Sequence, residues 1–496
     1  WPAVFLGGLV VLFGMGVAGP ARAVPAFARK YGTSCSRCHV AFPKLNAYGE
    51  AFKLRGYHTL GEEKAAAGVE DTRDPLLSLL RKVPVSFRVI ESLRFDEDTP
   101  LEFRGGSSLS FHAGGTLGPN IGFFSEFDLD GFERWQVVAS DLGWGGMEPT
   151  SLNVVFGNFE LVDYVFSQHR TMTRNPYGIY VTNIGGFSLA GQERGVMLYG
   201  TIHSGIGEEV VQEQIAEEAA AADVSAEELE ALEAELAAAQ PPATPEARAA
   251  EKILQILQQN QIITNEQADE VRAILAEGQP TTPEPEAEQE EAGPIPGART
   301  SYDQHSGLFW QAGLVNGTGG LDPDVEFENN PHKDVFGRLA HWFGDTRVGV
   351  LGYWGKSRLS SLDGTFENQF RRLGVDVSVY LGPEVNVGGV ANRRFNLFGF
   401  FAFGRDNNPL AAPPPTPSVR HSGGFVELDC LLSEREMAIA RYDFVHSDDL
   451  PDRERRELTL NYTYYVRRNV KVSPEVTFDF EGTQGHRLGV GLQSAF

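Results

Sequence analysis

Five consecutive residues carry the clearest chemistry in the chain: Cys35, Ser36, Arg37, Cys38 and His39 form a C-x-x-C-H run. Two thiols at this spacing can add across the vinyl groups of a haem, and the adjacent imidazole can reach its iron. We therefore expect one covalently bound haem c, attached to Cys35 and Cys38. His39 is the predicted proximal axial ligand of the haem iron, and no catalytic residue is predicted.

A C-x-x-C pair would also suit a zinc site or a redox-active dithiol. A tetrahedral zinc site needs about four ligands, and the chain has only one other cysteine, Cys430, far from the pair. A thioredoxin-like dithiol would need a βαβ context, which the flanking residues lack. Cys430 stands in a strand-like run and is predicted to be an inert free thiol. Both alternatives are therefore weaker than haem attachment.

The first residues have the pattern of an export signal. Residues 1–23 are predicted to be a signal peptide, because the apolar run from Trp1 to Val17 is shorter than the ~20 residues of a membrane span. Ala21 and Ala23 form the small-residue pattern that signal peptidase cleaves, so the mature chain is expected to begin at Val24. Haem attachment takes place outside the cytoplasm, which agrees with export.

From Val83 onward the chain is typical of a β-barrel that crosses a membrane. Segments of about ten residues alternate between apolar and polar positions and are separated by turn-prone clusters. The chain is rich in the residues of such segments, with 33 Phe, 14 Tyr and 55 Gly. Strands are expected over 109–116, 121–129, 347–353, 375–381, 425–431 and 458–465. A soluble β-sandwich is the alternative fold.

The spacing of turns predicts the number of strands. Tight turns are expected at 117–120, 344–347, 381–384 and 466–469, and long loops at 316–334 and 405–420. Six strands fit between Val83 and Ser204 if 185–203 is one long strand, and ten fit from about His305 onward. The total of sixteen is even, as bacterial barrels require, with both chain ends at the periplasmic rim. Leu488, Val490 and Leu492 alternate toward Phe496, which resembles the last strand of outer-membrane proteins.

These observations predict an all-β fold of six parts. The parts are the signal peptide at 1–23, a small α-helical monohaem cytochrome c segment at 24–60, a linker at 61–82 with a short helix near 75–81, a first barrel part at 83–206, an acidic helical insertion at 207–297, and a second barrel part at 298–496.

Charge is concentrated in the insertion. Residues 208–291 hold 22 acidic and three basic residues, which accounts for most of the net charge of −25. That balance argues against a nucleic-acid partner, because phosphate binding requires a surplus of Lys and Arg. Two helical stretches, 208–239 and 246–277, are separated by prolines. The insertion is either a solvated helical hairpin or a docking surface for a basic periplasmic electron carrier.

The haem segment and the barrel together resemble the fused monohaem cytochrome and porin family of bacterial outer-membrane proteins, which includes iron oxidases. The resemblance is most specific over Val24 to Tyr57 and lies in Pro25 to Arg29, Cys35 to His39, Phe42-Pro43, Gly49, Phe52 to Leu54 and Gly56-Tyr57. The chain departs from the iron-oxidase pattern at Lys30-Tyr31 and at Asn46 to Tyr48. The acidic insertion is also foreign to that family.

The resemblance implies electron transfer across the outer membrane, with Fe(II) as donor and a periplasmic c-type cytochrome or another carrier as acceptor. The enzyme activity would be that of an Fe(II):cytochrome c oxidoreductase. The other class of function is a porin or transport channel with a structural or sensory haem. Candidates for the second axial ligand are Met147, Met172, Met197, Met437, His58, His112 and His169. Four acids in a predicted extracellular loop, Asp322, Asp324, Glu326 and Glu328, either attract Fe(II) or are simply solvated.

Overall fold

The computed structural model describes residues 26–31, 35–58, 69–71, 78–80, 85–96, 102–104, 109–118, 120–128, 131–140, 142, 152–203, 307–317, 332–361, 364–387, 390–413, 418–467, 470–482 and 485–495. It divides into two compact units, and the second, Gly205–Gly293, lies outside these residues. The predicted signal peptide, the acidic insertion, Met147, the four loop acids and Phe496 also lie outside them.

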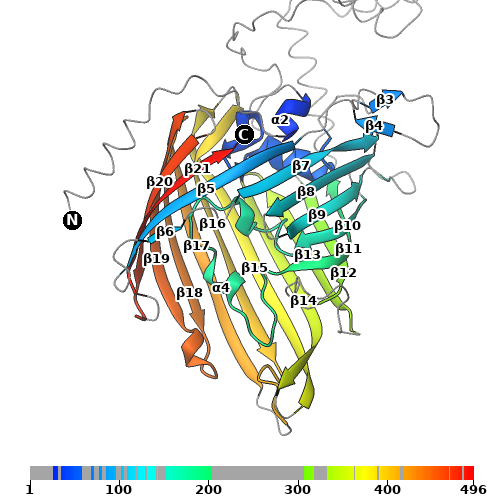
Figure 1. The fold of residues 1–496 in the computed structure, drawn as a ribbon, viewed down its shortest axis with the longest axis vertical. Coiled ribbons are helices and arrows are strands. Elements are labelled where there is room, and N and C mark those ends of the chain that lie inside the picture. The colour runs from blue at the N-terminus through cyan, green and yellow to red at the C-terminus, as the bar shows by residue number, and fades with distance from the viewer. Residues whose placement is uncertain are drawn as a thin grey trace, which may run out of the picture. The chain divides into compact units, whose positions relative to one another are not determined.

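The strands close into one antiparallel barrel (Figure 1). Its first part consists of β5 (Val85–Asp96), β6 (Glu102–Arg104), β7 (Leu109–Gly118), β8 (Ile121–Asp128), β9 (Gly131–Ala139), β10 (Asn153–Glu160) and β11 (Gln192–His203). Its second part consists of β12 (Gly307–Val315), β13 (Asp334–Phe343), β14 (Thr346–Ser361), β15 (Gly364–Val387), β16 (Val390–Asp406), β17 (Val419–Ser433), β18 (Glu436–His446), β19 (Arg455–Arg467), β20 (Val470–Asp479) and β21 (Arg487–Ala495).

The strand count agrees with the prediction. β6 and β7 both pair with β5, so they share one position in the wall. The barrel therefore has sixteen positions, six before the insertion and ten after it, and β21 pairs with β5 to close the ring. Closure leaves no edge strand exposed.

The wall is apolar outside and polar inside. On β15 the exposed Leu373, Val375 and Val377 alternate with the buried Arg372, Asp376 and Ser378. The register places Leu339 of β13 beside Val350 of β14, and Val350 beside Val375 of β15. All three face outward, so they form an apolar row across three strands. An outward apolar band of this kind is what a lipid bilayer requires of a barrel.

Three predicted local structures are wrong. Residues 78–80, expected within a short helix, form β4 (Ser78–Leu80), which pairs with β3 (Val69–Asp71). The Gly382-Pro383 pair does not end its strand, because β15 continues to Val387 with only a register shift between Leu381 and Glu384. The expected long strand at 185–203 begins only at Gln192, and the residues before it belong to a folded loop.

One end of the barrel, here called the short-turn rim, carries the tight turns after β7, β13, β15, β17 and β19. β5 starts and β21 ends at this rim. Residues 26–58, here called the plug, contain α2 (Ala26–Tyr31), η1 (Cys35–Arg37), β1 (His39–Ala41), β2 (Lys44–Leu45) and α3 (Ala47–Leu54). α2 lies against β7 near the end of the chain (Figure 1). None of the helices in the described ranges is long and apolar enough to cross a membrane.

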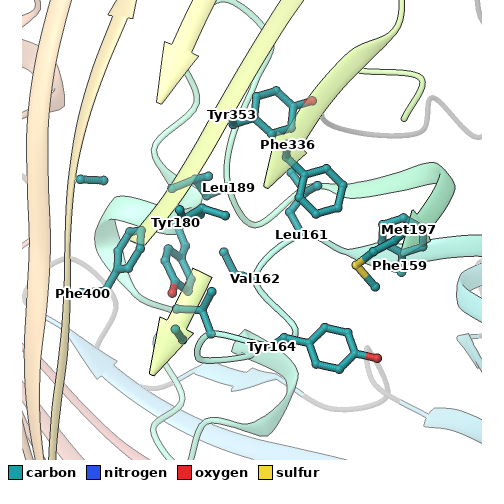
Figure 2. Close-up of a cluster of buried hydrophobic side chains, with 14 of the residues drawn as sticks. Phe159, Leu161, Val162, Tyr164, Tyr180, Leu189, Met197, Phe336, Tyr353 and Phe400 are labelled. Carbon is teal, nitrogen blue, oxygen red and sulfur yellow. The ribbon is translucent and has the colours of Figure 1, made fainter. Parts of the chain in front are cut away.

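A second segment fills the lumen from the opposite end. Residues 161–191, here called the inward loop, connect β10 to β11 and contain η3 (Gln168–Arg170) and α4 (Gly178–Val181). Leu161, Val162 and Tyr180 of this loop are almost completely buried. Figure 2 shows them packed among wall residues such as Phe336 and Phe400. The hydrophobic core of the protein therefore lies inside the barrel.

Candidate haem site in the barrel lumen

The C-x-x-C-H motif begins in a single tight turn. Cys35–Arg37 form the 3₁₀ turn η1, and the backbone N–H of Cys38 donates to the carbonyl of Cys35 at 3.2 Å. Neither cysteine forms a disulfide, and both side chains are half-buried. Burial raises the pKa of Cys35, and it raises the pKa of Cys38 to about 12, because a thiolate is poorly solvated there. Both side chains are therefore neutral thiols at physiological pH.

His39 is held in the form that binds a metal. Its Nδ1 lies 3.1 Å from the carbonyl oxygen of Pro43, and because a carbonyl only accepts, Nδ1 carries the proton. The lone pair of the neutral ring is then on Nε2, and a backbone carbonyl on the other nitrogen is the usual partner of a metal-binding histidine. Burial lowers the pKa of His39 to about 4, so the ring is neutral at physiological pH. These features fit the proposed role as proximal iron ligand.

Asn46 connects the motif to helix α3. Its side-chain oxygen accepts from the N–H of Gly49 at 2.9 Å and so caps the helix. Its amide nitrogen donates to the carbonyls of Ser36 and Arg37, at 3.1 and 3.0 Å. A Cβ on Gly49 would overlap the carbonyl oxygen of Cys38, so the helix can approach the motif only with glycine there. The sequence analysis did not identify Asn46 as structurally important, although an Asn before a helix is a capping signal.

Hydrogen bonds and ion pairs attach the plug to the wall near the short-turn rim. Lys44 pairs with Asp429 of β17. The carbonyl of Phe42 accepts from Tyr465 Oη at 2.9 Å and from Lys471 Nζ at 2.8 Å, and these residues belong to β19 and β20. The residues directly after the motif therefore have partners on three strands of one part of the wall, β17, β19 and β20.

The opposite side of the plug is attached by aromatic packing. Phe27 stacks on Tyr57 with ring centroids 5.1 Å apart, and both lie near Phe124 of β8. A Cβ on Gly114 would overlap the Phe27 ring, and one on Gly122 would overlap the carbonyl of Gly56. The wall strands therefore carry glycine where the plug approaches them most closely.

The plug is also ion-paired to the inward loop. Lys53 Nζ lies 2.6 Å from the Asp163 carboxylate, and both side chains are at most 5% exposed. Arg170 contacts the same carboxylate at 2.6 Å. Burial lowers the pKa of Lys53 to about 8, and the cations around Asp163 hold the pKa of that carboxyl well below its ordinary value. The plug and the inward loop therefore form one connected filling of the lumen.

A cavity of about 150 Å³ lies beside α3. Its walls combine aromatic and cationic side chains, including Tyr164, Phe166, Arg170, Trp342 and Arg347. The Nε of Arg347 is buried and has no hydrogen-bond partner among the described residues. Flat aromatic walls with a guanidinium group suit a planar molecule that carries carboxylates. The walls of the cavity therefore have the chemistry of such a site, and Cys35, Cys38 and His39 are not among its lining residues.

The structure separates the candidate second ligands into two groups. Met172 and Met437 pack in one cluster with Ala41, two residues after His39. The other described candidates, His58, His112, His169 and Met197, are not in that cluster. Cys430 lies within β17, as expected. Within the described ranges, no group of three or more His, Cys, Asp or Glu side chains could hold a metal ion.

No protein-family model and no curated protein matches the chain. Similar solved structures include a porin refined at 1.8 Å, with 10% identity and a TM-score of 0.42 over 84% of this chain and 100% of the other. An anion-selective porin from Comamonas acidovorans has 10% identity and a TM-score of 0.44 over 84% and 99%. OmpT of the Vibrio cholerae outer membrane has 10% identity and a TM-score of 0.43 over 84% and 97%. No statement about function follows from these likenesses.

Proposed function

We propose that the protein is an outer-membrane electron conduit with a haem c in its lumen. Cys35 and Cys38 would hold the haem and His39 would ligate its iron, and the haem would supply one-electron chemistry toward an extracellular donor, Fe(II) in the first place. A periplasmic c-type cytochrome or a similar carrier accepts the electrons. The observation that supports this proposal most strongly is that the residues directly after the C-x-x-C-H motif, Phe42 and Lys44, are bonded to inward-facing side chains of the barrel wall.

The arrangement suits transfer of electrons through an insulating layer. The hydrocarbon core of a membrane is ~30 Å thick, so a redox centre must lie within it to shorten the gap. The bound haem would supply the one-electron chemistry, while the protein supplies its position, axial ligation and dry surroundings. Each Fe(II) oxidised to Fe(III) outside gives one electron, which the carrier removes at the other side. Arg347 is one of several cations that line the cavity, and its unbonded Nε would be available to a haem carboxylate.

The proposed orientation has the short-turn rim in the periplasm. Long loops such as 407–418 then lie outside the cell, as in other bacterial barrels. The acidic insertion joins His203 to Gly307, and both of these residues lie at the short-turn rim. The chain therefore leaves β11 and re-enters β12 at the rim where a basic carrier would approach, and the acidic charge between these two strands in sequence would speed their encounter.

A porin or transport channel with a structural haem is the second candidate function, and the sixteen-position barrel favours it. The two candidates differ in what occupies the lumen. Burial of Phe52, Tyr57, Val162 and Tyr180 inside the barrel favours the conduit, because these side chains take the space through which a solute would pass. Conductance in planar bilayers separates the two: a closed barrel supports a conduit, and steady pore currents support a channel.

The decisive experiment is anaerobic stopped-flow of the oxidised protein in detergent with Fe(II), following the α-band of reduced haem. The conduit predicts reduction at a rate that rises with Fe(II) concentration. A Cys35→Ala, Cys38→Ala double variant is the control, since it should carry no covalent haem on a denaturing gel. Haem that reduces with dithionite but not with Fe(II) would rule out iron as the donor. A wild-type protein without covalent haem would rule out the conduit itself.

A further inference from the structure

Two methionines pack against Ala41, two residues after the histidine of the motif, although they are far from it in sequence. Met172 belongs to the inward loop and Met437 to β18, and they are 4% and 3% exposed. They pack with Ala41 and Ile439 in a small cluster that Tyr465 covers. Ala41 ends the short strand β1, which begins with His39. Two thioether sulfurs are thus buried next to the strand that carries the predicted iron ligand.

The side chain of Lys471 connects Met172 to the residues after His39. Its ammonium lies 3.9 Å from the Met172 sulfur and 2.8 Å from the carbonyl oxygen of Phe42. The ring centroid of Phe42 is 5.1 Å from that of His39. Lys471 thus contacts both the sulfur of Met172 and the carbonyl oxygen of Phe42, the residue whose ring packs on the ring of His39.

The other described candidates have partners outside the cluster of Ala41. His58 Nδ1 bonds to the Arg55 carbonyl at 3.0 Å. His112 Nε2 lies 3.6 Å from Glu126 on β8. The charges that act on His169 are those of Arg134, Glu126, Arg88 and Asp163, and Met197 packs in the main core. None of these partners belongs to the cluster of Ala41, whose wall residues Met437, Ile439 and Tyr465 lie on β18 and β19.

Met172 and Met437 differ in how freely their backbones can adjust. β18 pairs with β17 on one side and β19 on the other, so Met437 is fixed by two ladders of hydrogen bonds. Met172 follows η3 in a loop whose nearby hydrogen bonds are made mainly by the side chains of Thr171 and Thr173. A loop residue can move its sulfur toward a haem without breaking the barrel wall.

We propose that Met172 supplies the second axial ligand of the haem iron, opposite His39. This inference depends on the haem site proposed above and specifies its ligation. A thioether ligand raises the reduction potential of a haem relative to a second histidine. That direction suits an acceptor of electrons from Fe(II). Met437 then fills the same cluster by packing alone.

The test compares Met172→Leu and Met172→His with two matched controls, Met437→Leu and Met197→Leu. Wild-type oxidised protein should show the weak long-wavelength absorption band that a thioether ligand gives to ferric haem c. Met172→Leu should lose this band. Met172→His should instead give the low-spin spectrum of two histidine ligands and a lower midpoint potential. Both controls should keep the wild-type band and potential, since each removes a buried methionine without removing the ligand.

Several results would overturn the proposal. If Met172→Leu keeps the band and potential, Met172 is not the ligand, and loss of the band in Met437→Leu assigns the ligand to β18. Should Met172→Leu fail to fold, Met172→His still decides, because it replaces one ligand by another and must change the spectrum. Covalent haem is measured separately on a denaturing gel. Wild-type protein without it contradicts the proposed function, whereas haem-loaded protein with an unchanged Met172→Leu spectrum contradicts only the ligand assignment.

Discussion

Replacing Lys53 by methionine is expected to loosen the plug while leaving the barrel intact. The Lys53 ammonium lies 2.6 Å from the Asp163 carboxylate and also donates to the Asp163 carbonyl at 2.6 Å. It stands 4.0 Å from the centre of the Tyr164 ring, which adds a cation–π contact. Methionine keeps most of the apolar stem, so the variant removes mainly the charge.

The size of the effect follows from what remains around Asp163. Removing one partner of a buried ion pair typically costs ~3–5 kcal/mol, because the other charge stays buried. Here Asp163 keeps Arg170 at 2.6 Å and Arg134 at 3.8 Å, so the lost charge is partly replaced. We expect about 2 kcal/mol for Lys53→Met, or roughly 30-fold in the docking equilibrium. Asp163→Asn should cost more, because it leaves several cations without their shared carboxylate.

Limited proteolysis measures this equilibrium, since cleavage within 26–58 follows the population of the released plug. Heat-modifiable migration on gels reports the barrel separately. Lys356→Met is the matched control: its 2.6 Å pair with Glu367 is solvent-exposed, so its loss should cost less than ~1 kcal/mol. Equal protease resistance of wild type and Lys53→Met would refute the argument. So would a smaller effect for Asp163→Asn than for Lys53→Met.

Three further predictions concern the plug, the outer face and the response to pH. Gly122→Ala should weaken docking of the plug by ~1–3 kcal/mol and expose it to protease, because the new Cβ would overlap the carbonyl oxygen of Gly56. Gly337→Ala is the control and should have no such effect, because its Cβ would lie 3.4 Å from the nearest atom. Val350→Arg should destabilise the barrel in bilayers by ~2–4 kcal/mol, as measured by urea titration in vesicles, against ~0–1 for Val466→Arg at the rim. Burial lowers the pKa of His169 from 6.5 to about 3. Between pH 3 and 6.5, His169 is therefore protonated only when the inward loop is released from the barrel. Docking should therefore weaken as pH falls below 6.5, and His169→Asn should flatten the pH profile of proteolysis.

The barrel was predictable because strand patterns are local. Alternation over about ten residues marks each strand, and the position of tight turns and long loops fixes the direction of each one. The expected strands at 109–116 and 458–465 correspond to β7 and β19. Where a segment was ambiguous, the requirement of an even number of strands decided the count. The number of strands could therefore be predicted without knowledge of any contact between distant residues.

The errors occurred where tertiary contacts override local signals. Gly382-Pro383 usually marks a turn, but here the register shifts between Leu381 and Glu384, and β15 continues past the pair. At such an irregularity the missing N–H of proline removes no regular ladder bond. At 185–191 the residues have a strand-like composition, but Gly185 lies against Asn368 and Pro409 inside the barrel. Neither outcome could be derived from the sequence around it.

The two sides of the proposed haem site also differ in how far they depend on contacts between residues distant in sequence. The proximal side is local, since Cys35, Cys38 and His39 span five residues, and Asn46 and Pro43 orient them from the next few. The distal side is not local. Met172 and Lys471 meet across a separation of 299 residues, and only the folded barrel brings β20 and the inward loop together. A motif can thus predict that a haem is bound, whereas the second ligand proposed for it lies on elements that only the barrel brings together.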